Sequence, residues 1–559
     1  MPFDNNYKSK IMMNVRNSAG LVLFALVALS ACSKQAPNSP AVASNFLSVY
    51  NDINEDELKR HVKTLASDEF GGRLPGSAGE QLTLDYLVNE LRTAGLVAGN
   101  GDSYLQQVEL TEISADPNMT LTIGNNQLVY KQEMVVSSKH EKPLVELKDS
   151  ELVFVGYGVV APEYDWNDYQ GLDVKGKTVV ILVNDPGFEN PQSGKFQGKT
   201  MTYYGRWTYK YEEASRQGAA AALIVHETAP ASYGWSVVAN SWGGAQYGLV
   251  SPNGNADRVA VEGWISNEAA QKIFADAGLD FAEQKQLAMA GPHHQALALN
   301  ASVSIHNSIK TSTSYNVIAT VPGSLHPDEH VIYSAHWDHL GTDSSKEGDQ
   351  IYNGAHDNAT GVAANLAIAK AFAQLDIAPQ RSTTFLFVTA EEQGLLGSQY
   401  YAEHPIIPIK QTVANINMDA LSVLGRTKDI EVVGMGKSEL ENILARAATR
   451  QSRQLTEEAQ PEKGSYFRSD HFNFAKVGIP ALYAKGGSQP IDEATAQYRK
   501  RANVIITGCY HQVCDQFREN WDLSGMQQDS QLLFEVGYIL TNSDDWPEWS
   551  PTSEFQRSK

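Results

Sequence analysis

The sequence predicts an α/β protein in which a mostly parallel mixed sheet, flanked by helices, is interrupted by a smaller β-rich domain. From about residue 301, short hydrophobic runs alternate with helical patterns such as 361–375, which is typical of parallel strands joined by crossover helices. The segment from about 146 to 300 instead brings short strands, many turns and aromatic residues. We therefore expect this β-rich segment to be an insert within the α/β domain.

Hydrophobic periodicity and turn residues place the individual elements. Helices are expected at 55–65 and at 80–96, where apolar side chains recur on one face and Gly95 provides a stop. Strands are expected at 152–157, 178–184, 221–226 and 259–265 in the insert, and at 331–335, 385–388 and 413–417 beyond it. Because catalytic groups of open α/β sheets gather at the carboxyl ends of strands, we expect the functional site beyond the last three.

Length and composition indicate a folded chain with several parts. The 559 residues are too many for one ordinary domain, and 42% hydrophobic with 19% charged residues is typical of globular proteins. The formal net charge of −21 argues against nucleic acid as a partner. The expected parts are a signal peptide with a lipobox (1–32), a flexible tether (33–50), the first part of the main domain (51–145), the insert (146–300), the catalytic part (301–545) and a C-terminal tail (546–559).

The first 32 residues predict export. Basic residues at 8, 10 and 16 precede the apolar run 21–29, which is too short to span a bilayer and leads into Leu29-Ser30-Ala31-Cys32. That tetrapeptide resembles a bacterial lipobox, which implies cleavage before Cys32, a lipid anchor on it and, with Ser33 next, sorting to the outer membrane. An ordinary cleaved signal peptide is the alternative. In both cases we expect the chain outside the cytoplasm, touching a membrane only through an N-terminal lipid.

The two remaining cysteines are Cys509 and Cys514. Four residues between them allow a disulfide but do not force one, and an oxidising compartment favours it. The sequence therefore favours a disulfide and leaves it open. Neither cysteine is expected to bind zinc, because no CxxC pair is present.

Five acidic or histidine residues stand where short hydrophobic runs end and turns begin: His336, Asp357, Glu392, Asp419 and His471. Imidazole nitrogen and carboxylate oxygen suit Zn²⁺, and Asp357, at the turn before the helix 361–375, is the natural carboxylate to bridge two ions. Taken singly, His336 and His471 are better explained as partly buried histidines, and the acids could be helix N-terminal, capping or turn residues. Together they favour a two-metal site. The other histidines considered are expected to be surface or supporting residues: His339, His356, His404 and His511.

The segments around these five residues resemble the co-catalytic zinc aminopeptidase family, which includes secreted bacterial aminopeptidases and, more distantly, glutamate carboxypeptidase, the transferrin receptor and glutaminyl cyclase. The loop SDEFGGRLPGSAG at 67–79 resembles that family as well, and 151–188 is similar to the protease-associated domain often inserted in its members. The resemblance implies a zinc-peptidase fold with two Zn²⁺ ions per chain. Such sites also accept cobalt or manganese.

The resemblance also implies a role for each residue. His336 and Asp419 would bind one zinc, Glu392 and His471 the other, and Asp357 both. Glu391 would be the general base that takes the proton of a water between the ions, and Asp338 would support the site. The implied reaction is hydrolysis of the N-terminal residue from peptides with a free N-terminus.

Other functions share this metal core. A carboxypeptidase of the glutamate carboxypeptidase type would need an arginine cluster, and Arg468 and 499–501 supply basic residues without an evident pattern. An acyltransferase resembling glutaminyl cyclase is the second alternative. A receptor without activity is disfavoured, because none of the five ligands is missing.

Overall fold

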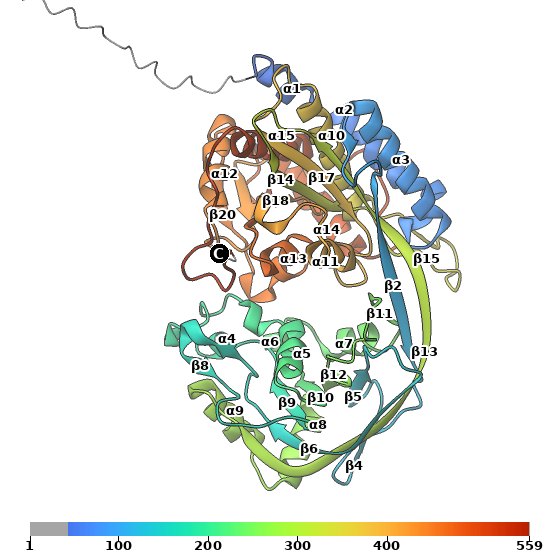
Figure 1. Cartoon of the computed structure of the whole chain (residues 1–559), viewed down its shortest axis with the longest axis vertical. Coiled ribbons are helices and arrows are strands. Elements are labelled where there is room, and N and C mark those ends of the chain that lie inside the picture. The colour runs from blue at the N-terminus through green and yellow to red at the C-terminus, as the bar shows by residue number, and fades with distance from the viewer. Residues whose placement is uncertain (1–42, 558–559) are drawn as a thin grey trace, which may run out of the picture. The chain divides into compact units, whose positions relative to one another are not determined.

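The computed structural model describes residues 43–557, so the expected signal peptide and the lipid attachment site at Cys32 lie outside the described residues. In Figure 1, two sheets are visible, and one long strand, β13 (Gln295–Val321), runs through both of them. Its first half pairs with β6 (Leu144–Phe154), and its second half pairs with β2 (Leu105–Ala115) and β17 (Arg381–Val388). Within 43–557, no helix is long and apolar enough to cross a membrane.

The sheet of the main domain is built around parallel strands. Its order is β11-β2-β13-β17-β14-β18-β21, and the pairs β17–β14, β14–β18 and β18–β21 are parallel while the others are antiparallel. The remaining bounds are β1 (Val97–Ala98), β11 (Gln246–Leu249), β14 (His326–His336), β18 (Thr412–Asn417) and β21 (Ala481–Gly486), with β19 (Asp429–Val432) and β20 (Gln454–Glu457) added beyond β21. The fold class expected from the sequence is confirmed.

Helices cover both faces of this sheet because its strands are apolar on both sides. In β17, Phe385 and Phe387 join one core cluster, whereas Leu386 and Val388 join another, as the two-residue period of a strand requires. The first cluster lies under α1 (Phe46–Asp52), α2 (Glu55–Leu65), α3 (Ala78–Ala94), α10 (Thr360–Ala373), α12 (Leu440–Ala448) and α15 (Ser524–Thr541). The second lies under α11 (Leu396–Glu403) and α13 (His471–Lys476).

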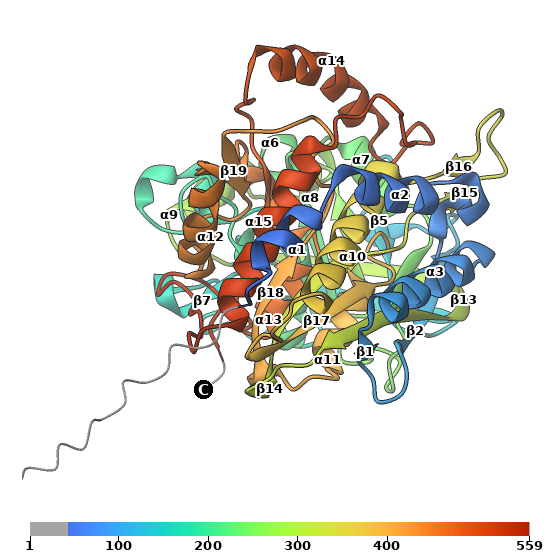
Figure 2. The ribbon, with the colours of Figure 1, turned by 90° about the horizontal axis from the view of Figure 1, so that it is seen from above.

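One helix stands apart from these layers. α14 (Glu493–Cys509) has a single buried residue, Cys509, and exposes Val504 and Ile505. Figure 2, the view from above, shows α14 at the upper edge, away from the helices that cover the sheet. The chain leaves this helix directly into the loop that holds Cys514.

The insert has its own sheet and its own core. The strand order is β4-β3-β13-β6-β9-β10-β12-β5, with parallel pairing from β6 to β12. The bounds are β3 (Leu121–Ile123), β4 (Asn126–Leu128), β5 (Met134–Ser137), β9 (Thr178–Leu182), β10 (Ala221–Val225) and β12 (Val261–Ile265). Its longer helices are α5 (Trp207–Arg216), α7 (Trp235–Ser241), α8 (Asn267–Asp276) and α9 (Phe281–Ala290).

Most expected elements coincide with observed ones, and the differences lie at the boundaries. The helix expected at 55–65 is α2, whose N-cap Asn54 accepts a hydrogen bond from the N–H of Glu57. The helix expected at 80–96 is α3, which ends at Gly95 with φ of 93°. The insert's sheet begins before residue 146, because β3, β4 and β5 pair with it. Residues 46–50 of the expected tether belong to α1, and Trp549 and Phe555 of the expected tail are buried.

Candidate metal centre

Three parallel strands bring the predicted acidic and histidine side chains to one edge of the sheet. His336 is the last residue of β14, Glu391 and Glu392 follow β17, and Asp419 follows β18. Because β14 pairs in parallel with both neighbours, these three ends meet. Asp357 reaches the same place from the turn Ala355–Ala359 that precedes α10.

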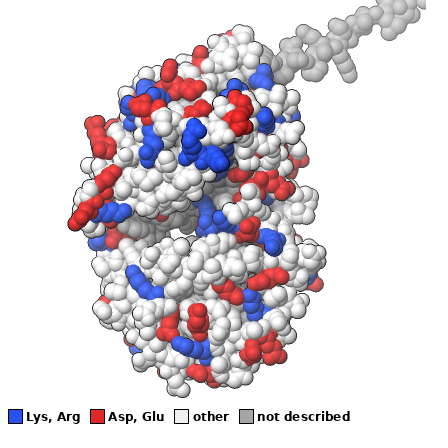
Figure 3. All heavy atoms as spheres, turned by 180° about the vertical axis from the view of Figure 1, so that it is seen from behind, with Lys and Arg blue, Asp and Glu red and all other residues white. Residues whose placement is uncertain are grey.

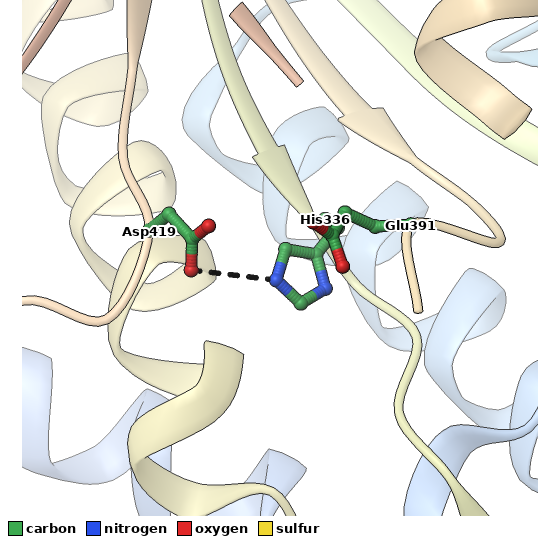
Figure 4. A group of neighbouring side chains, drawn as sticks. All are labelled: His336, Glu391 and Asp419. Carbon is green, nitrogen blue, oxygen red and sulfur yellow. Dashed lines mark ion pairs between the residues drawn. The ribbon is translucent and has the colours of Figure 1, made fainter. Parts of the chain in front are cut away.

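The first group of candidate ligands contains His336, Glu391 and Asp419. Their ligand atoms lie within 4.8 Å of one another, and Figure 4 shows the His336 ring between the two carboxylates. His336 Nε2 is 3.5 Å from Asp419 Oδ1 and 3.2 Å from Asp357 Oδ1. The Ser469 hydroxyl donates to the other Asp419 oxygen at 2.6 Å, which fixes the orientation of that carboxylate.

The second group contains His339, Asp357 and Glu392, again within 4.8 Å of one another. His339 Nδ1 is 2.6 Å from Glu392 Oε1. The imidazole of His511 completes the group, with Nε2 at 2.9 Å from Glu392 Oε2 and 3.1 Å from Asp357 Oδ2. Asp357 therefore has one oxygen beside each group, the position that a carboxylate bridging two ions would occupy.

His471 is not brought into either group. Both of its ring nitrogens are buried without a hydrogen-bond partner in the part of the chain that the structure describes. Its ring packs between Tyr466 and Tyr483, at centroid distances of 4.5 and 5.2 Å, and burial lowers its pKa to about 3. The expected second histidine ligand is corrected to His511, the imidazole that contacts both Asp357 and Glu392.

The other histidines that the sequence analysis set aside differ in their placement. His339 and His511 belong to the second group, as described above. His356 lines the cavity beside the site. His404 is an exposed residue that stacks on Tyr400. Sequence reasoning thus missed two imidazoles of the site.

Asp338 contacts two members of the first group, His336 and the backbone of Glu391. Its side-chain oxygens accept hydrogen bonds from the backbone N–H of Glu391 at 3.0 Å and of Glu392 at 3.3 Å. The same carboxylate lies 3.8 Å from His336 Nδ1, and burial raises its pKa to about 6. Asp338 therefore orients a histidine and the turn that carries both glutamates.

Glu391 has the environment of a proton acceptor. Burial raises its pKa well above the usual value, and His336 partly opposes that shift. Its side chain lines the cavity, while that of Glu392 is held between His339 and His511. The two adjacent glutamate side chains therefore lie in different places. That of Glu391 lines the cavity, and that of Glu392 lies in the second group.

Buried contacts from distant parts of the chain support the site. Asp515 accepts hydrogen bonds from the backbone N–H of His356 and of Asp357, and it follows directly on the disulfide between Cys509 and Cys514. His511 lies within that disulfide loop, so the loop positions both an imidazole and the Asp357 turn. The sequence signal that could have found it is the run CYHQVCD, a histidine inside a short cysteine pair followed by an acid.

A cavity of about 840 Å³ opens beside the two groups. It is lined by Asp357, Glu391 and Asp419 at one end and by residues of β21, α14 and the loop 465–469 elsewhere. This volume is in the range of sites that hold small ligands. The site is therefore accessible to a peptide of a few residues.

The donor set fits zinc. Imidazole nitrogens and carboxylate oxygens within 4.8 Å of one another are the ligands that Zn²⁺ prefers, and a bridging carboxylate is typical of paired ions. Among the described residues, both cysteines of the loop are in the disulfide and are not donors. The acids and histidines named above account for the site.

Comparisons with known proteins agree with this geometry. The chain is 24% identical over 496 residues to a probable leucine aminopeptidase 2 of Aspergillus oryzae, covering 87% of this chain and 83% of that protein. It is 27% identical over 279 residues to aminopeptidase Y of Saccharomyces cerevisiae, covering 47% and 46%. The fold is similar to that of the aminopeptidase from Aneurinibacillus sp. strain AM-1, with a TM-score of 0.50 at 19% identity, over 92% of this chain and 100% of that one.

A family match covers the whole candidate metal centre. Residues 316–535 match Peptidase family M28, and this range contains every residue of both groups, including His511. The family resemblance expected from the sequence is confirmed. The match of residues 316–535 to this family, together with the aminopeptidase relatives, shows that the protein is a metallopeptidase.

Proposed function

We propose that this chain is a two-zinc aminopeptidase that removes the first residue from peptides with a free N-terminus. The position of Asp357, with Oδ1 beside His336 and Oδ2 beside His511, is the observation that carries the proposal. His336 and Asp419 would hold one ion, and Glu392 and His511 the other. The aminopeptidase names of the relatives support the choice of substrate end.

The chain's own residues suit a hydrolysis step. When bound, two Zn²⁺ ions would supply Lewis-acid polarisation of the scissile carbonyl and would lower the pKa of a water. Glu391, half-buried and lining the cavity, takes the proton from the attacking water and returns it to the leaving amine. Asp338 holds the backbone of Glu391, so the base keeps its position while its protonation changes.

A matched substrate pair tests the proposal. We expect the purified protein to hold two zinc ions and to hydrolyse Leu-Ala-amide, to ignore N-acetyl-Leu-Ala-amide, and to lose activity after dialysis against a chelator. Hydrolysis of the blocked peptide but not of the free one would contradict the aminopeptidase proposal and favour a carboxypeptidase. Cyclisation of an N-terminal glutamine without hydrolysis would favour an acyltransferase.

We further propose that the protein is exported and carries a lipid on Cys32. The lipobox-like sequence at 29–32 supports this, and so does the disulfide between Cys509 and Cys514, since disulfides persist in oxidising compartments. Palmitate labelling of the wild type but not of the Cys32→Ala variant would be the expected result. Labelling of neither protein would leave the ordinary signal peptide as the explanation.

A further inference from the structure

Part of the wall of the cavity beside the metal groups is cationic. Arg468, Lys485, Arg499 and Lys500 line the same cavity as Asp357, Glu391 and Asp419. They come from three separate segments, namely the loop before α13, strand β21 and helix α14. The chain as a whole has 65 acidic and 44 basic residues, so four basic side chains in one cavity run against its composition.

These four cations lack acidic partners. None of them is in an ion pair of 4.0 Å or less with a residue of 43–557, although many surface lysines and arginines are, such as Lys476 with Glu212. Lys485 Nζ instead donates to the hydroxyl of Tyr483 at 3.2 Å, and that hydroxyl donates to the backbone oxygen of Asp419 at 3.0 Å. Lys485 is therefore separated from the first metal group by one side chain.

Arg499 shows the same lack of a partner at its guanidinium. Nη2 donates to the backbone oxygen of Gly487, while Nη1 is buried without a hydrogen-bond partner among the described residues. Two acids lie near it, but both are engaged elsewhere. Asp529 pairs with Arg453 at 2.8 Å, and Asp429 accepts the backbone N–H groups of residues 488 and 489.

Acidic residues of the cavity do not balance this charge. Apart from the candidate ligands and Glu391, the acidic side chain in the described lining is Glu431. Burial raises the pKa of Glu431, which Lys485 partly opposes. One acid therefore faces four cations.

The insert adds a further arginine near this wall. Arg206, at the start of α5, has a buried Nε without a partner within residues 43–557. Burial and then the nearby guanidinium of Arg468 lower the pKa of Arg206 to about 10. Figure 3 shows lysine and arginine side chains gathered beside the hollow of the molecule seen from behind. Two guanidinium groups from different domains, close together and without a carboxylate, are stabilised when an anion binds between them.

We infer that the wall formed by Arg468, Lys485, Arg499 and Lys500 binds a carboxylate of the substrate, so that the enzyme acts preferentially on peptides that place a carboxylate in this cavity. The inference rests on the proposed aminopeptidase function and adds a substrate class to it. The carboxylate has three possible sources, namely the first side chain, the second side chain, and the C-terminus of a dipeptide. All three present the same group to arginine and lysine.

Three pairs of neutral and anionic substrates separate these sources. They are Glu-Ala-amide against Gln-Ala-amide, Ala-Glu-amide against Ala-Gln-amide, and Ala-Ala against Ala-Ala-amide. Hydrogen bonds to charged groups make us expect kcat/KM to be about tenfold to a hundredfold higher for the anionic member of at least one pair. A ratio near or below one in all three pairs, with the neutral peptides hydrolysed, would overturn the inference and leave the aminopeptidase proposal intact. Hydrolysis of none of the six would overturn both.

Variants locate the effect. Arg468→Gln, Lys485→Gln and Arg499→Gln should each move the ratio of kcat/KM within the preferred pair toward one. Because the readout is a ratio, a variant that merely folds less well lowers both members and leaves it unchanged. Arg501→Gln is the matched control, since Arg501 is exposed on the same helix but does not line this cavity. An equal loss of preference in the control would assign the effect to net charge and refute the wall.

Discussion

Replacing His511 with alanine is expected to weaken one metal ion selectively. His511 Nε2 lies 2.9 Å from Glu392 and 3.1 Å from Asp357, so it is a nitrogen donor of the second group, which also contains His339. Zinc sites with four ligands bind with about 10–16 kcal/mol, which assigns about 3 kcal/mol to one ligand. At about 1.4 kcal/mol per tenfold, His511→Ala should weaken binding of that ion about a hundredfold. The ion beside His336 and Asp419 should stay bound.

Metal content per chain, measured after dialysis against a graded series of chelator, is the assay. We expect the wild type to release both ions over a narrow range of chelator concentration. His511→Ala should release one ion at a chelator concentration about a hundredfold lower. Activity should fall with the first ion lost. Circular dichroism should be unchanged, because His511 is only half-buried on a loop.

His471→Leu is the matched comparison. Both ring nitrogens of His471 are buried without partners, so a leucine loses no hydrogen bond and keeps an apolar contact with Tyr466. We expect this variant to keep two ions at wild-type affinity. The reasoning would be refuted if folded His471→Leu lost one ion, or if His511→Ala kept both with unchanged affinity.

Three further changes test the supporting structure. Glu391→Gln should keep both metals and lower kcat by about 10²–10⁴, and a near-normal kcat in a metal-loaded sample would remove Glu391 as the base. Replacing both Cys509 and Cys514 with serine removes a cross-link that contributes about 2 kcal/mol for so short a loop. We expect zinc affinity, measured by chelator competition, to fall while the rest of the fold changes little. Unchanged affinity would mean that the loop keeps its shape without the disulfide. Arg73→Met leaves the backbone oxygens of residues 65, 337, 353 and 354 without their buried donor. We expect the free energy of unfolding, measured with urea, to fall by at least about 3 kcal/mol. A smaller loss would show that water replaces the guanidinium.

The sheet could be predicted where each strand buries its own apolar residues. Residues 385–388 of β17 and most of β18 are continuous or alternating apolar side chains, so these positions follow from local sequence alone. Residues 381–384 of β17 are polar, and local sequence did not predict them as strand. The middle of β13 could not be predicted in this way. Its residues 307–313 are mostly polar and exposed, and they form a strand because β2, some 200 positions earlier, pairs with them. Long-range pairing of β3 with β13 and of β5 with β12 likewise moved the boundary of the insert away from 146.

In the candidate site, too, residues at strand ends could be predicted from the local sequence, whereas residues placed by distant contacts could not. His336 ends a strand, and Glu391 and Asp419 come within three residues of a strand end, so the expectation that catalytic groups lie at the carboxyl ends of parallel strands was enough to place them together. His511 follows a solvent-exposed helix and has no strand before it. What brings it to Asp357 is a disulfide together with the contact of Asp515 to the Asp357 turn, and both involve residues more than 150 positions from Asp357 in the chain.

Arg73 ties the segment before the insert to the metal centre. Its guanidinium is buried and donates to backbone oxygens of residues 337, 353 and 354, which lie next to His336 and directly before the Asp357 turn. The same group donates to the backbone oxygen of Leu65 at the end of α2. Because the insert separates Arg73 from these residues in the chain, the metal centre cannot reach its observed geometry until both flanks of the insert have met. The antiparallel pairing of β2 with β13 brings those flanks together. The strands that connect the insert to the main domain therefore also bring Arg73 to the metal centre.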